Sequence, residues 1–495
     1  MTEKRRRRLW GAFVVCGLVA LGAIGVARVR PSFLARSAKL TPSSPEVDAL
    51  RAAVKDANVL IVVLDAMRAD HVGCYGYPRD TTPNLDRTAR SSVQFDWHFS
   101  QSSETKSSTA CLLTSQYCDT NLADGPRRLL PGTFTMEKGL ERAGLRTLLI
   151  SSNLKATPLY GLGDDFQEVV ADKEFDPLLK EGGKRYSPTV ALRAFAGWLD
   201  SHSKERFFAY VHFAPPHYPY EQPEEFTKLF RGLEPVDFEP GGVPFPERIP
   251  KPFPTPPALP EWINLYDANL RYGDWAVGEA EKLLSERGLL EKTLVIITAD
   301  HGEAFGEHAH PWHGRSVYDE ACHIPLLMRF PNGVGARRRI EALTQTIDLL
   351  PTIFDLLAVK RPGKGMQGKS LAPLLAGAAD PVREYVFCRG GGSPSKYLVR
   401  SKEQALILYS NGEWQARYDL KKDPKQRRNV IGENAAVAEE MVEAFRRFAE
   451  EQRRPPRDFL EPGVKMPPLP EAPELKLSPE DRARVERIAD LGYVR

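Results

Sequence analysis

The sequence has few cysteines, and none of them form a paired motif. Only six occur among 495 residues, and the absence of a Cys-x-x-Cys pair argues against a zinc site built from thiolates. Cys16 lies in an apolar run, and the remaining five are Cys74, Cys111, Cys118, Cys322 and Cys388. Because five is an odd number, at least one thiol stays free whichever of them pair, and the pairing itself stays open.

A strong excess of one charge is also absent. Five of the 68 basic and one of the 65 acidic residues lie within residues 1–8, which leaves 63 basic and 64 acidic side chains in residues 9–495. Proteins that bind nucleic acids carry a basic stripe or patch, so a near-neutral body without one argues against that class. We therefore expect no nucleic-acid partner.

One long apolar run without charge is present, from Leu9 to Ala27, directly after the basic residues Lys4 to Arg8. As a helix it spans roughly 28 Å, close to the thickness of a bilayer's hydrocarbon core. The basic residues favour a cytoplasmic N-terminus, so a single-pass membrane anchor places the body in the periplasm or outside the cell. A signal peptide cleaved after Gly25-Val26-Ala27 and a buried core helix are the alternatives.

Short apolar runs alternate with helical patterns along most of the chain. The runs NVLIVVLD (58–65), LRTLLIS (145–151), FFAYVHF (207–213) and TLVIIT (293–298) are typical of strands buried on both faces. Residues 266–288 show a helical pattern that ends in glycine. This alternation predicts an α/β fold with a large, mostly parallel central sheet, helices on both faces, and a smaller C-terminal α+β part.

The chain therefore divides into six predicted segments. These are a basic cytoplasmic tail (1–8), a transmembrane anchor or signal (9–27), a linker (28–57), a large domain (58–380), a C-terminal subdomain (381–430) and a helical, Pro-rich tail (431–495). We find no internal repeats, so a solenoid or propeller is not expected.

Acidic and imidazole side chains follow three of the predicted strands. Asp65 ends the first strand, Asp300 and His301 follow another, and His217 lies just beyond a third. Ligands of open parallel sheets bind beyond the carboxyl ends of the strands, so we expect these side chains to meet. Because a buried carboxylate needs a counter-charge, the set predicts a divalent metal site, and its mixture of carboxylate and imidazole suits zinc or manganese better than calcium.

Histidines are concentrated after the strand at 293–298. Four of the ten lie within thirteen residues, at positions 301, 308, 310 and 313. A solvated polar loop explains such a cluster equally well, and a single histidine is more often structural than functional. The adjacency of Asp300 and His301 at a strand end is the feature that favours metal ligation.

Residues 104–117, ETKSSTACLLTSQY, place several hydroxyl groups just before an apolar helical pattern. A metal held by Asp65, Asp300 and His301 requires a nucleophile beside it. Metal coordination lowers the pKa of a hydroxyl group, and a helix N-terminus favours the negative charge that develops on it. The stretch therefore predicts group transfer at an acyl-type or phosphoryl-type centre.

Taken in order, these motifs resemble the sulfatase branch of the alkaline phosphatase superfamily. NVLIVVLDAMRADHVGCYGYPRDTTPNLD is similar to the family's first strand and metal loop, and TLVIITADHGEAFGEH is similar to its second metal motif. VYDEACHIPLLMRFP, QTIDLLPTIFDLLAV, QGKSLAPLL and RYDLKKDPKQRRNV resemble its C-terminal landmarks. The likeness runs from Asn58 to about Val430 and implies the alkaline phosphatase/sulfatase fold and a sulfuric or phosphoric ester hydrolase in residues 58–380.

The nucleophile motif departs from the family pattern. Aligned on Leu112-Leu113-Thr114, the nucleophile position is Thr105, where sulfatases carry the Cys or Ser that is oxidised to formylglycine. Threonine is not a substrate for that conversion, so no formylglycine is expected. Ser107 and Thr109 replace the motif's proline and arginine, while Ser108 keeps its serine. Threonine at this position resembles the superfamily's phosphoryl-transferring members.

Carried over by position, the resemblance implies a single metal ion held by Asp65, Thr105, Asp300 and His301. The family's usual second aspartate is Ala66 here, and its Asp-Asn pair is Asp300-His301. Both changes favour zinc or manganese, although calcium stays open.

Further residues are carried over to the transferred anion. His217 and His313 occupy positions that contact this anion, and we expect both to bind substrate and to act in catalysis. His308 matches the histidine of the family's Gly-Glu-His segment and is expected to bind substrate. Arg68 adds positive charge to the substrate site or, as an alternative, is a surface salt-bridge partner.

Three functions follow from this reading. The first is a metal-dependent hydrolase of sulfate or phosphate esters with a covalent threonyl intermediate. The second is a membrane-anchored transferase of the phosphoethanolamine or phosphoglycerol type acting on an envelope lipid or glycan. The third is an inactive binding protein on the same scaffold. The sequence favours the first and does not name the substrate.

Overall fold

The computed structural model describes most of the body of the chain. It covers residues 40–124, 128–129, 132–171, 186–236, 259–308, 311–361, 365–392, 394–411 and 413–452. The predicted tail (1–8), the predicted anchor or signal (9–27), His310 and the chain beyond residue 452 lie outside the described residues. Within the described part, no helix combines the length and the hydropathy needed to cross a membrane.

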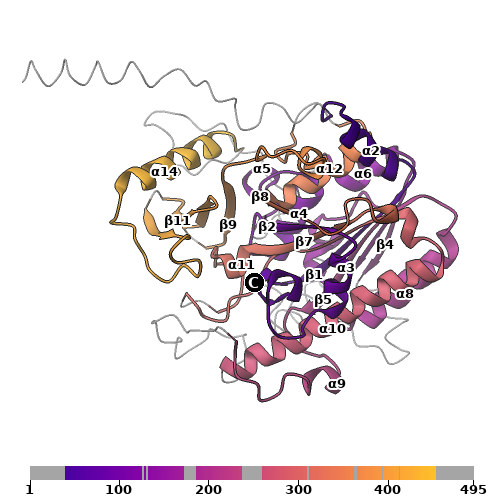
Figure 1. The fold of residues 1–495 in the computed structure, drawn as a ribbon, viewed down its shortest axis with the longest axis horizontal. Helices are drawn as coiled ribbons and strands as arrows, with labels where there is room; N and C mark the ends of the chain where they lie inside the picture. Colours follow the sequence, from indigo (N-terminus) through magenta and orange to yellow (C-terminus); the bar gives the residue numbers. More distant parts are fainter. Residues whose placement is uncertain are drawn as a thin grey trace, which may run out of the picture. The chain divides into compact units, whose positions relative to one another are not determined.

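Eight strands form the central sheet (Figure 1). They are β1 (Asn58–Asp65), β2 (Val93–Phe99), β3 (Arg146–Ser151), β4 (Glu168–Ala171), β5 (Phe207–Pro216), β6 (Thr293–Ala299), β7 (His323–Arg329) and β8 (Arg338–Gln345). Their order is β4-β3-β5-β1-β6-β7-β2-β8. Among these strands β7 runs antiparallel to its neighbours, and the other pairs are parallel. The predicted mostly parallel sheet is therefore confirmed.

Helices cover both faces of this sheet. The described helices of seven or more residues in the whole molecule, of which α14 belongs to the C-terminal part, are α2 (Pro45–Val54), α3 (Pro83–Ala89), α4 (Thr105–Thr114), α6 (Met136–Arg142), α8 (Pro188–His202), α10 (Leu259–Glu286), α12 (Leu349–Leu356) and α14 (Ala435–Glu450). Short helical turns are α5 (Cys118–Asn121), α9 (Glu224–Thr227), α11 (Asp319–Cys322) and α13 (Ala372–Leu375). In Figure 1, α8 and α10 lie on one side of the sheet, and α2, α6 and α12 lie on the other.

Strand periodicity explains this layered core. Successive side chains of a strand point to opposite faces, so a strand between two helical layers must be apolar throughout. In β1, Leu60 and Val62 pack into the cluster that contains α8 and α10. Ile61 and Val63 pack into the cluster that contains α2, α4, α6 and α12. Every residue of β1 is buried as a result.

A second, smaller sheet follows. Its strands are β9 (Val386–Gly390), β10 (Lys396–Arg400), β11 (Gln404–Tyr409) and β12 (Trp414–Asp419), all antiparallel in the order β12-β11-β10-β9. Helix α14 packs beside β10 and buries Met441, Phe445 and Phe448. This arrangement confirms the predicted smaller C-terminal α+β part.

Candidate metal centre and active site

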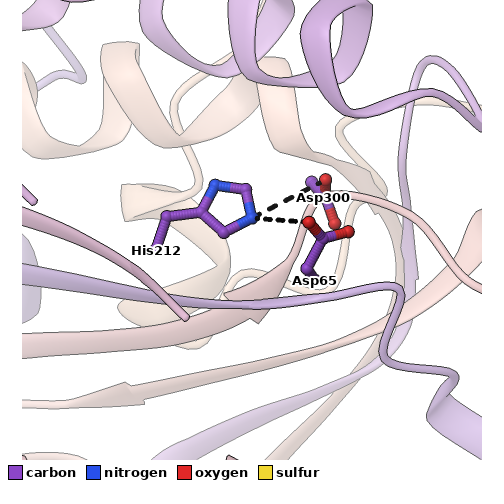
Figure 2. Close-up of side chains that lie close together, drawn as sticks. All are labelled: Asp65, His212 and Asp300. Atoms are coloured by element: carbon purple, nitrogen blue, oxygen red, sulfur yellow. Dashed lines mark ion pairs between the residues drawn. The ribbon is translucent and has the colours of Figure 1, made fainter. Parts of the chain in front are cut away.

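Two carboxylates and one imidazole converge at the carboxyl ends of the three central strands (Figure 2). Asp65 is the last residue of β1, Asp300 follows β6, and His212 lies in β5 opposite Val63. His212 Nε2 is 3.4 Å from Asp65 Oδ2 and 3.9 Å from Asp300 Oδ2. All three side chains are fully buried, so their charges are not screened by solvent.

The alternation of strand side chains places these groups on one face of the sheet. Val63 of β1 and Tyr210 of β5 belong to the core beneath α4, so Asp65 and His212, each two residues later, point the same way. Asp300 follows β6 at the same two-residue period, so its side chain also points to the face of the sheet beneath α4. The predicted meeting of Asp65 and Asp300 therefore follows from register and periodicity.

Thr105, the first residue of α4, lies beside this group. Thr105 Oγ1 is 3.2 Å from His301 Nε2, and it accepts a 3.3 Å hydrogen bond from Asn153 Nδ2. Asn153 Nδ2 also donates to Asp65 Oδ2 at 2.5 Å. His301 Nε2 is 3.6 Å from Asp65 Oδ1 and 3.5 Å from Asp300 Oδ2. The structure thus brings together Asp65, Thr105, Asp300 and His301, the four residues predicted as metal ligands.

In the described part of the chain, one oxygen of each carboxylate lacks the hydrogen-bond partner that a buried acid normally has. Asp65 Oδ1 and Asp300 Oδ2 make no hydrogen bond with any described residue, and the same holds for both ring nitrogens of His212. Burial and the adjacent Asp65 raise the pKa of Asp300. Burial also acts to raise the pKa of Asp65, but His217, His212 and His301 outweigh it and lower that pKa below its usual range.

These residues fit a divalent cation. Asp65, His212 and Asp300 each offer a ligand atom, and these atoms lie within 4.8 Å of one another. Two adjacent buried carboxylates repel each other unless a positive charge lies between them, and an ion bound by both removes that repulsion. The donor set of carboxylate oxygen and imidazole nitrogen is the one that zinc and manganese prefer.

A second group of side chains packs against His301. The rings of His313 and His301 stack with centroids 4.4 Å apart, and His313 Nε2 is 3.3 Å from His217 Nε2. The carboxylate of Glu303 lies 3.0 Å from His313 Nδ1 and fixes the orientation of that ring. Burial lowers the pKa of His217 to about 4 and that of His313 below its usual range, and it raises the pKa of Glu303 to about 7. Both predicted catalytic histidines therefore lie next to the candidate metal centre.

Arg68 lies in a set of ion pairs. Its guanidinium is 2.7 Å from Asp70 and 2.5 Å from Glu307, and it donates a 2.9 Å hydrogen bond to the carbonyl of Glu303. The guanidinium carbon also lies 4.8 Å from the centre of the Phe305 ring. Arg68 therefore joins the loop after β1 to the segment 303–307, which matches the salt-bridge alternative, although Arg68 itself is buried while Asp70 is exposed.

His308 also contacts residues other than Thr105. Its Nδ1 is 2.9 Å from Glu320, its Nε2 is 2.8 Å from the carbonyl oxygen of Gln426, and its ring stacks on Tyr318 with centroids 3.7 Å apart. His308 and Arg68 both line a cavity of about 710 Å³, whose described lining residues do not include Thr105. Both residues predicted to bind substrate at these positions thus contact structural partners in this conformation.

Sequence reasoning missed His212 and Asn153. His212 lies inside the run FFAYVHF, where the period of two from Phe208 and Tyr210 places it on the α4 face. This period-of-two spacing is the sequence signal that could have identified His212. Asn153 lies two residues beyond Ser151, the end of β3, and carries no motif that distinguishes it from a polar loop residue.

Comparison with known families supports the same assignment. The profile of the family described as Sulfatase matches residues 57–359, which is more than half of the chain. The profile described as N-sulphoglucosamine sulphohydrolase, C-terminal, matches residues 306–453.

Individual relatives cover nearly the whole described body. N-acetylglucosamine-6-O-sulfatase of Bacteroides thetaiotaomicron is 23% identical over 493 residues, covering 81% of this chain and 87% of the relative. The phosphonate monoester hydrolase of Agrobacterium radiobacter has a TM-score of 0.67 at 20% identity, covering 78% and 94% of the two chains. A protein solved in complex with its substrate D-glucosamine-2-N,6-O-disulfate has a TM-score of 0.67 at 21% identity, covering 81% and 99%. Profile, motif order and fold agree that this chain is a sulfatase-like ester hydrolase and belongs to the sulfatase family.

Proposed function

We propose that the chain hydrolyses sulfate or phosphate esters with Thr105 as the nucleophile. The observation that supports this is the position of its hydroxyl, whose Oγ1 lies 3.3 Å from Asn153 Nδ2 and 3.2 Å from His301 Nε2. Thr105 is also the first residue of the ten-residue helix α4, and the positive end of the helix dipole favours negative charge on Oγ1.

The residues that would hold a metal ion are Asp65, Asp300 and His301, with Thr105 Oγ1 as a further ligand. When bound, the ion lowers the pKa of the hydroxyl and neutralises part of the charge on the transferred group. We expect one ion, with zinc or manganese preferred over calcium, and no formylglycine.

The protein's own residues then account for the bond changes. Thr105 Oγ1 attacks the sulfur or phosphorus atom, its proton passes to the pair formed by His217 and His313, and the bond from the sulfur or phosphorus atom to the leaving oxygen breaks. His217 and His313, whose Nε2 atoms are 3.3 Å apart, are placed to exchange this proton with the leaving alcohol. Water then attacks the threonyl ester, sulfate or phosphate departs, and Thr105 is restored.

The relatives indicate two classes of substrate. One is named N-acetylglucosamine-6-O-sulfatase, one was solved in complex with its substrate D-glucosamine-2-N,6-O-disulfate, and one is a phosphonate monoester hydrolase. We propose sulfated amino sugars as the first class to test and aryl phosphates or phosphonate monoesters as the second.

The test combines turnover with the mass of the trapped enzyme. Aryl sulfate, sulfated glucosamine, aryl phosphate and phosphonate monoester are each assayed with the wild type, with Thr105→Ala, and with Thr114→Ala at the far end of the same helix. We expect Thr105→Ala to lose at least about 10³-fold in kcat on every active substrate, and Thr114→Ala to keep the kcat of the wild type. Accurate mass of a peptide with Thr105, taken from acid-quenched enzyme, identifies the transferred group. Unchanged turnover by Thr105→Ala would defeat the proposal.

A second candidate is a membrane-anchored transferase acting on an envelope lipid or glycan. Its support is the apolar run Leu9 to Ala27 together with threonine at the nucleophile position. Under this proposal the body lies in the periplasm or outside the cell, held by a single span. Cell fractionation checks the location, and assays with and without an acceptor lipid show whether the group moves to that acceptor or to water.

A further inference from the structure

The family motifs leave one buried imidazole of the centre without a role. His212 lies in the middle of the sheet, and its ring points at the two carboxylates from within β5 (Figure 2). We infer that His212 binds the metal ion through Nε2 as an additional ligand, and that this second nitrogen selects a transition metal over calcium. The inference rests on the proposed metal-dependent function.

The burial of His212 supports a ligand role. A neutral imidazole has one donor and one acceptor nitrogen, and leaving either of them buried without a partner costs free energy. Both nitrogens of His212 lack a hydrogen bond with the described residues, although the side chain is fully buried. His98, another fully buried histidine in β2, differs in one nitrogen: its Nδ1 is 2.9 Å from Thr344 Oγ1, whereas its Nε2 also lacks a hydrogen bond within the described residues.

The distances in the centre match ligand spacing better than hydrogen bonding. Ligand atoms about 2.0–2.2 Å from one ion lie about 3–4 Å from each other. His212 Nε2 is 3.4 Å and 3.9 Å from the nearest oxygens of Asp65 and Asp300. His301 Nε2 is 3.6 Å and 3.5 Å from oxygens of the same two carboxylates. Each imidazole therefore has the same relation to the carboxylate pair, and His301 is the one that the family motif already predicts as a ligand.

The identity of the donor atoms then determines which ion is preferred. Calcium is bound by six to eight oxygen ligands, whereas imidazole nitrogen suits zinc and other transition metals. With His212 the set holds two imidazole nitrogens beside the oxygens of two carboxylates and Thr105, a mixture that suits a transition metal and not calcium. The known departures at Ala66 and His301 reduce the number of oxygens, and His212 adds a nitrogen in their place.

X-ray absorption at the zinc edge of the loaded full chain tests this directly. The wild-type spectrum counts bound imidazoles without any substitution, and we expect two. We expect one imidazole in His212→Leu, with zinc affinity lower by about 10²-fold or more in a chelator competition. His98→Leu is the matched control for loss of a buried histidine and should keep both imidazoles. His212→Asp should restore binding while shifting the preference from zinc towards calcium.

The outcomes separate this inference from the proposed function. One imidazole in the wild type, with zinc affinity of His212→Leu within about tenfold of normal, makes His212 an outer neighbour of the ligands and overturns the inference alone. If the wild type binds no metal and Asp300→Asn changes nothing, the proposed metal function falls as well. Circular dichroism confirms folding of each variant, and His212→Gln replaces His212→Leu if the latter does not fold.

The cysteines carry a second, independent inference. Cys322 Sγ at the end of α11 is 2.7 Å from Cys388 Sγ in β9, and both side chains are buried. Cys111 Sγ is 3.4 Å from Cys118 Sγ. Unbonded heavy atoms settle at about 3.5–4.0 Å, so Cys322 and Cys388 approach more closely than two separate thiols normally do. We propose that a disulfide joins Cys322 to Cys388 and links the central sheet to the C-terminal sheet.

The bond forms by thiol–disulfide exchange. The two thiols give up two protons and two electrons to a disulfide oxidant, such as an oxidised dithiol protein or oxidised glutathione, which leaves as two thiols. This chemistry requires an oxidising compartment, as the predicted extracytoplasmic body would provide.

Peptide mapping of the purified full chain tests the disulfide. After alkylation under denaturing, non-reducing conditions, we expect a cross-linked peptide with Cys322 and Cys388 that disappears on reduction. Cys74 should carry the alkyl label and is the internal control. Cys322→Ser should free Cys388 for labelling and lower the melting temperature to that of the reduced wild type. Full labelling of both residues after treatment with oxidised glutathione would overturn the proposal.

Discussion

Two clusters of charged side chains follow β1 closely, and they differ in how their charge is balanced. Around Arg68 the positive charge faces Asp70 and Glu307 at 2.7 Å and 2.5 Å. Around Asp65 the two buried carboxylates have imidazoles as their ion-pair partners among the described residues, and one oxygen of each has no hydrogen bond there. The first cluster is complete as it stands and holds two loops together. The cluster around Asp65 needs a cation to balance its charge. We therefore assign the chemistry to this unbalanced cluster and a structural role to the balanced cluster around Arg68.

The largest effect should come from the unbalanced cluster. Asp300→Asn keeps the shape of the side chain but removes a negative ligand, so we expect loss of bound metal at neutral pH and a fall of about 10⁴-fold or more in kcat/KM. Metal analysis and ester turnover measure both quantities. Chelation of the wild type should give the same loss, and added zinc or manganese should reverse it. Retention of metal and turnover by Asp300→Asn would break the comparison.

A smaller effect is expected from the histidines beside the centre. His217→Gln should lower kcat by about 10²- to 10⁴-fold, the usual contribution of general acid–base catalysis. The loss should be larger for alkyl esters than for nitrophenyl esters, because a good leaving group needs no proton. The control is His202→Gln, whose histidine lies on α8 and stacks on Trp198. A loss that does not depend on the leaving group would assign His217 to binding instead.

The balanced cluster should respond in stability and not in chemistry. Arg68→Met leaves the partly buried Glu307 without its cation and the carbonyl of Glu303 without its donor, and we expect the free energy of unfolding to fall by about 1–2 kcal/mol with kcat nearly unchanged. Arg271→Met is the comparison, since its partner Asp80 is 76% exposed and such pairs contribute less than about 1 kcal/mol. Urea unfolding and turnover separate the two effects. A large loss of kcat without loss of stability would place Arg68 in the substrate site.

The last effect changes the pH dependence of stability alone, and it concerns a buried acid that has, among the described residues, no adjacent buried carboxylate bound to the same centre. Glu137 in α6 has no hydrogen-bond partner in the described part of the chain, and burial raises its pKa from 4.5 to about 8. Between these values the folded protein holds a proton that the unfolded chain has released, so this group stabilises the fold at acidic pH and its contribution falls as pH rises.

Unfolding measured at several pH values checks this prediction. Relative to the wild type, Glu137→Gln should remove a decline of about 1 kcal/mol per pH unit between about pH 5 and pH 8. Glu141→Gln, at an exposed position of the same helix, should leave the decline in place. Identical curves for the wild type and Glu137→Gln would show that the acid is not buried as described. Glu137, a single buried acid, is thus neutralised by a proton, whereas the adjacent buried acids Asp65 and Asp300 require a bound metal ion.

Much of the fold could be predicted because its signals are local and repeated. The apolar runs at 58–65, 207–213 and 293–298 became β1, β5 and β6, and the helical patterns between them became the covering layers. The direction of β7 could not be predicted, because HIPLLMR is as apolar as a parallel strand and only the chain connection sets its orientation. The strand order of the small C-terminal sheet could not be predicted for the same reason.

The site was predictable only in part. Asp65, Asp300 and His301 stand out as polar residues directly after apolar runs, and Thr105 was identified through the resemblance to the family. His212 did not stand out, since it lies inside a strand where a single polar residue suggests an ordinary buried hydrogen bond. Arg68 was ambiguous because its partner Glu307 lies 239 residues away in the sequence.

The three strands that carry the centre are far apart in the chain. β1 ends at residue 65, β5 begins at residue 207 and β6 ends at residue 299. During synthesis the donor set is therefore incomplete until well over half of the polypeptide has emerged and its last central strand has docked. For an exported enzyme, the ion is then acquired where folding finishes, and the donor set selects among the ions that this compartment supplies.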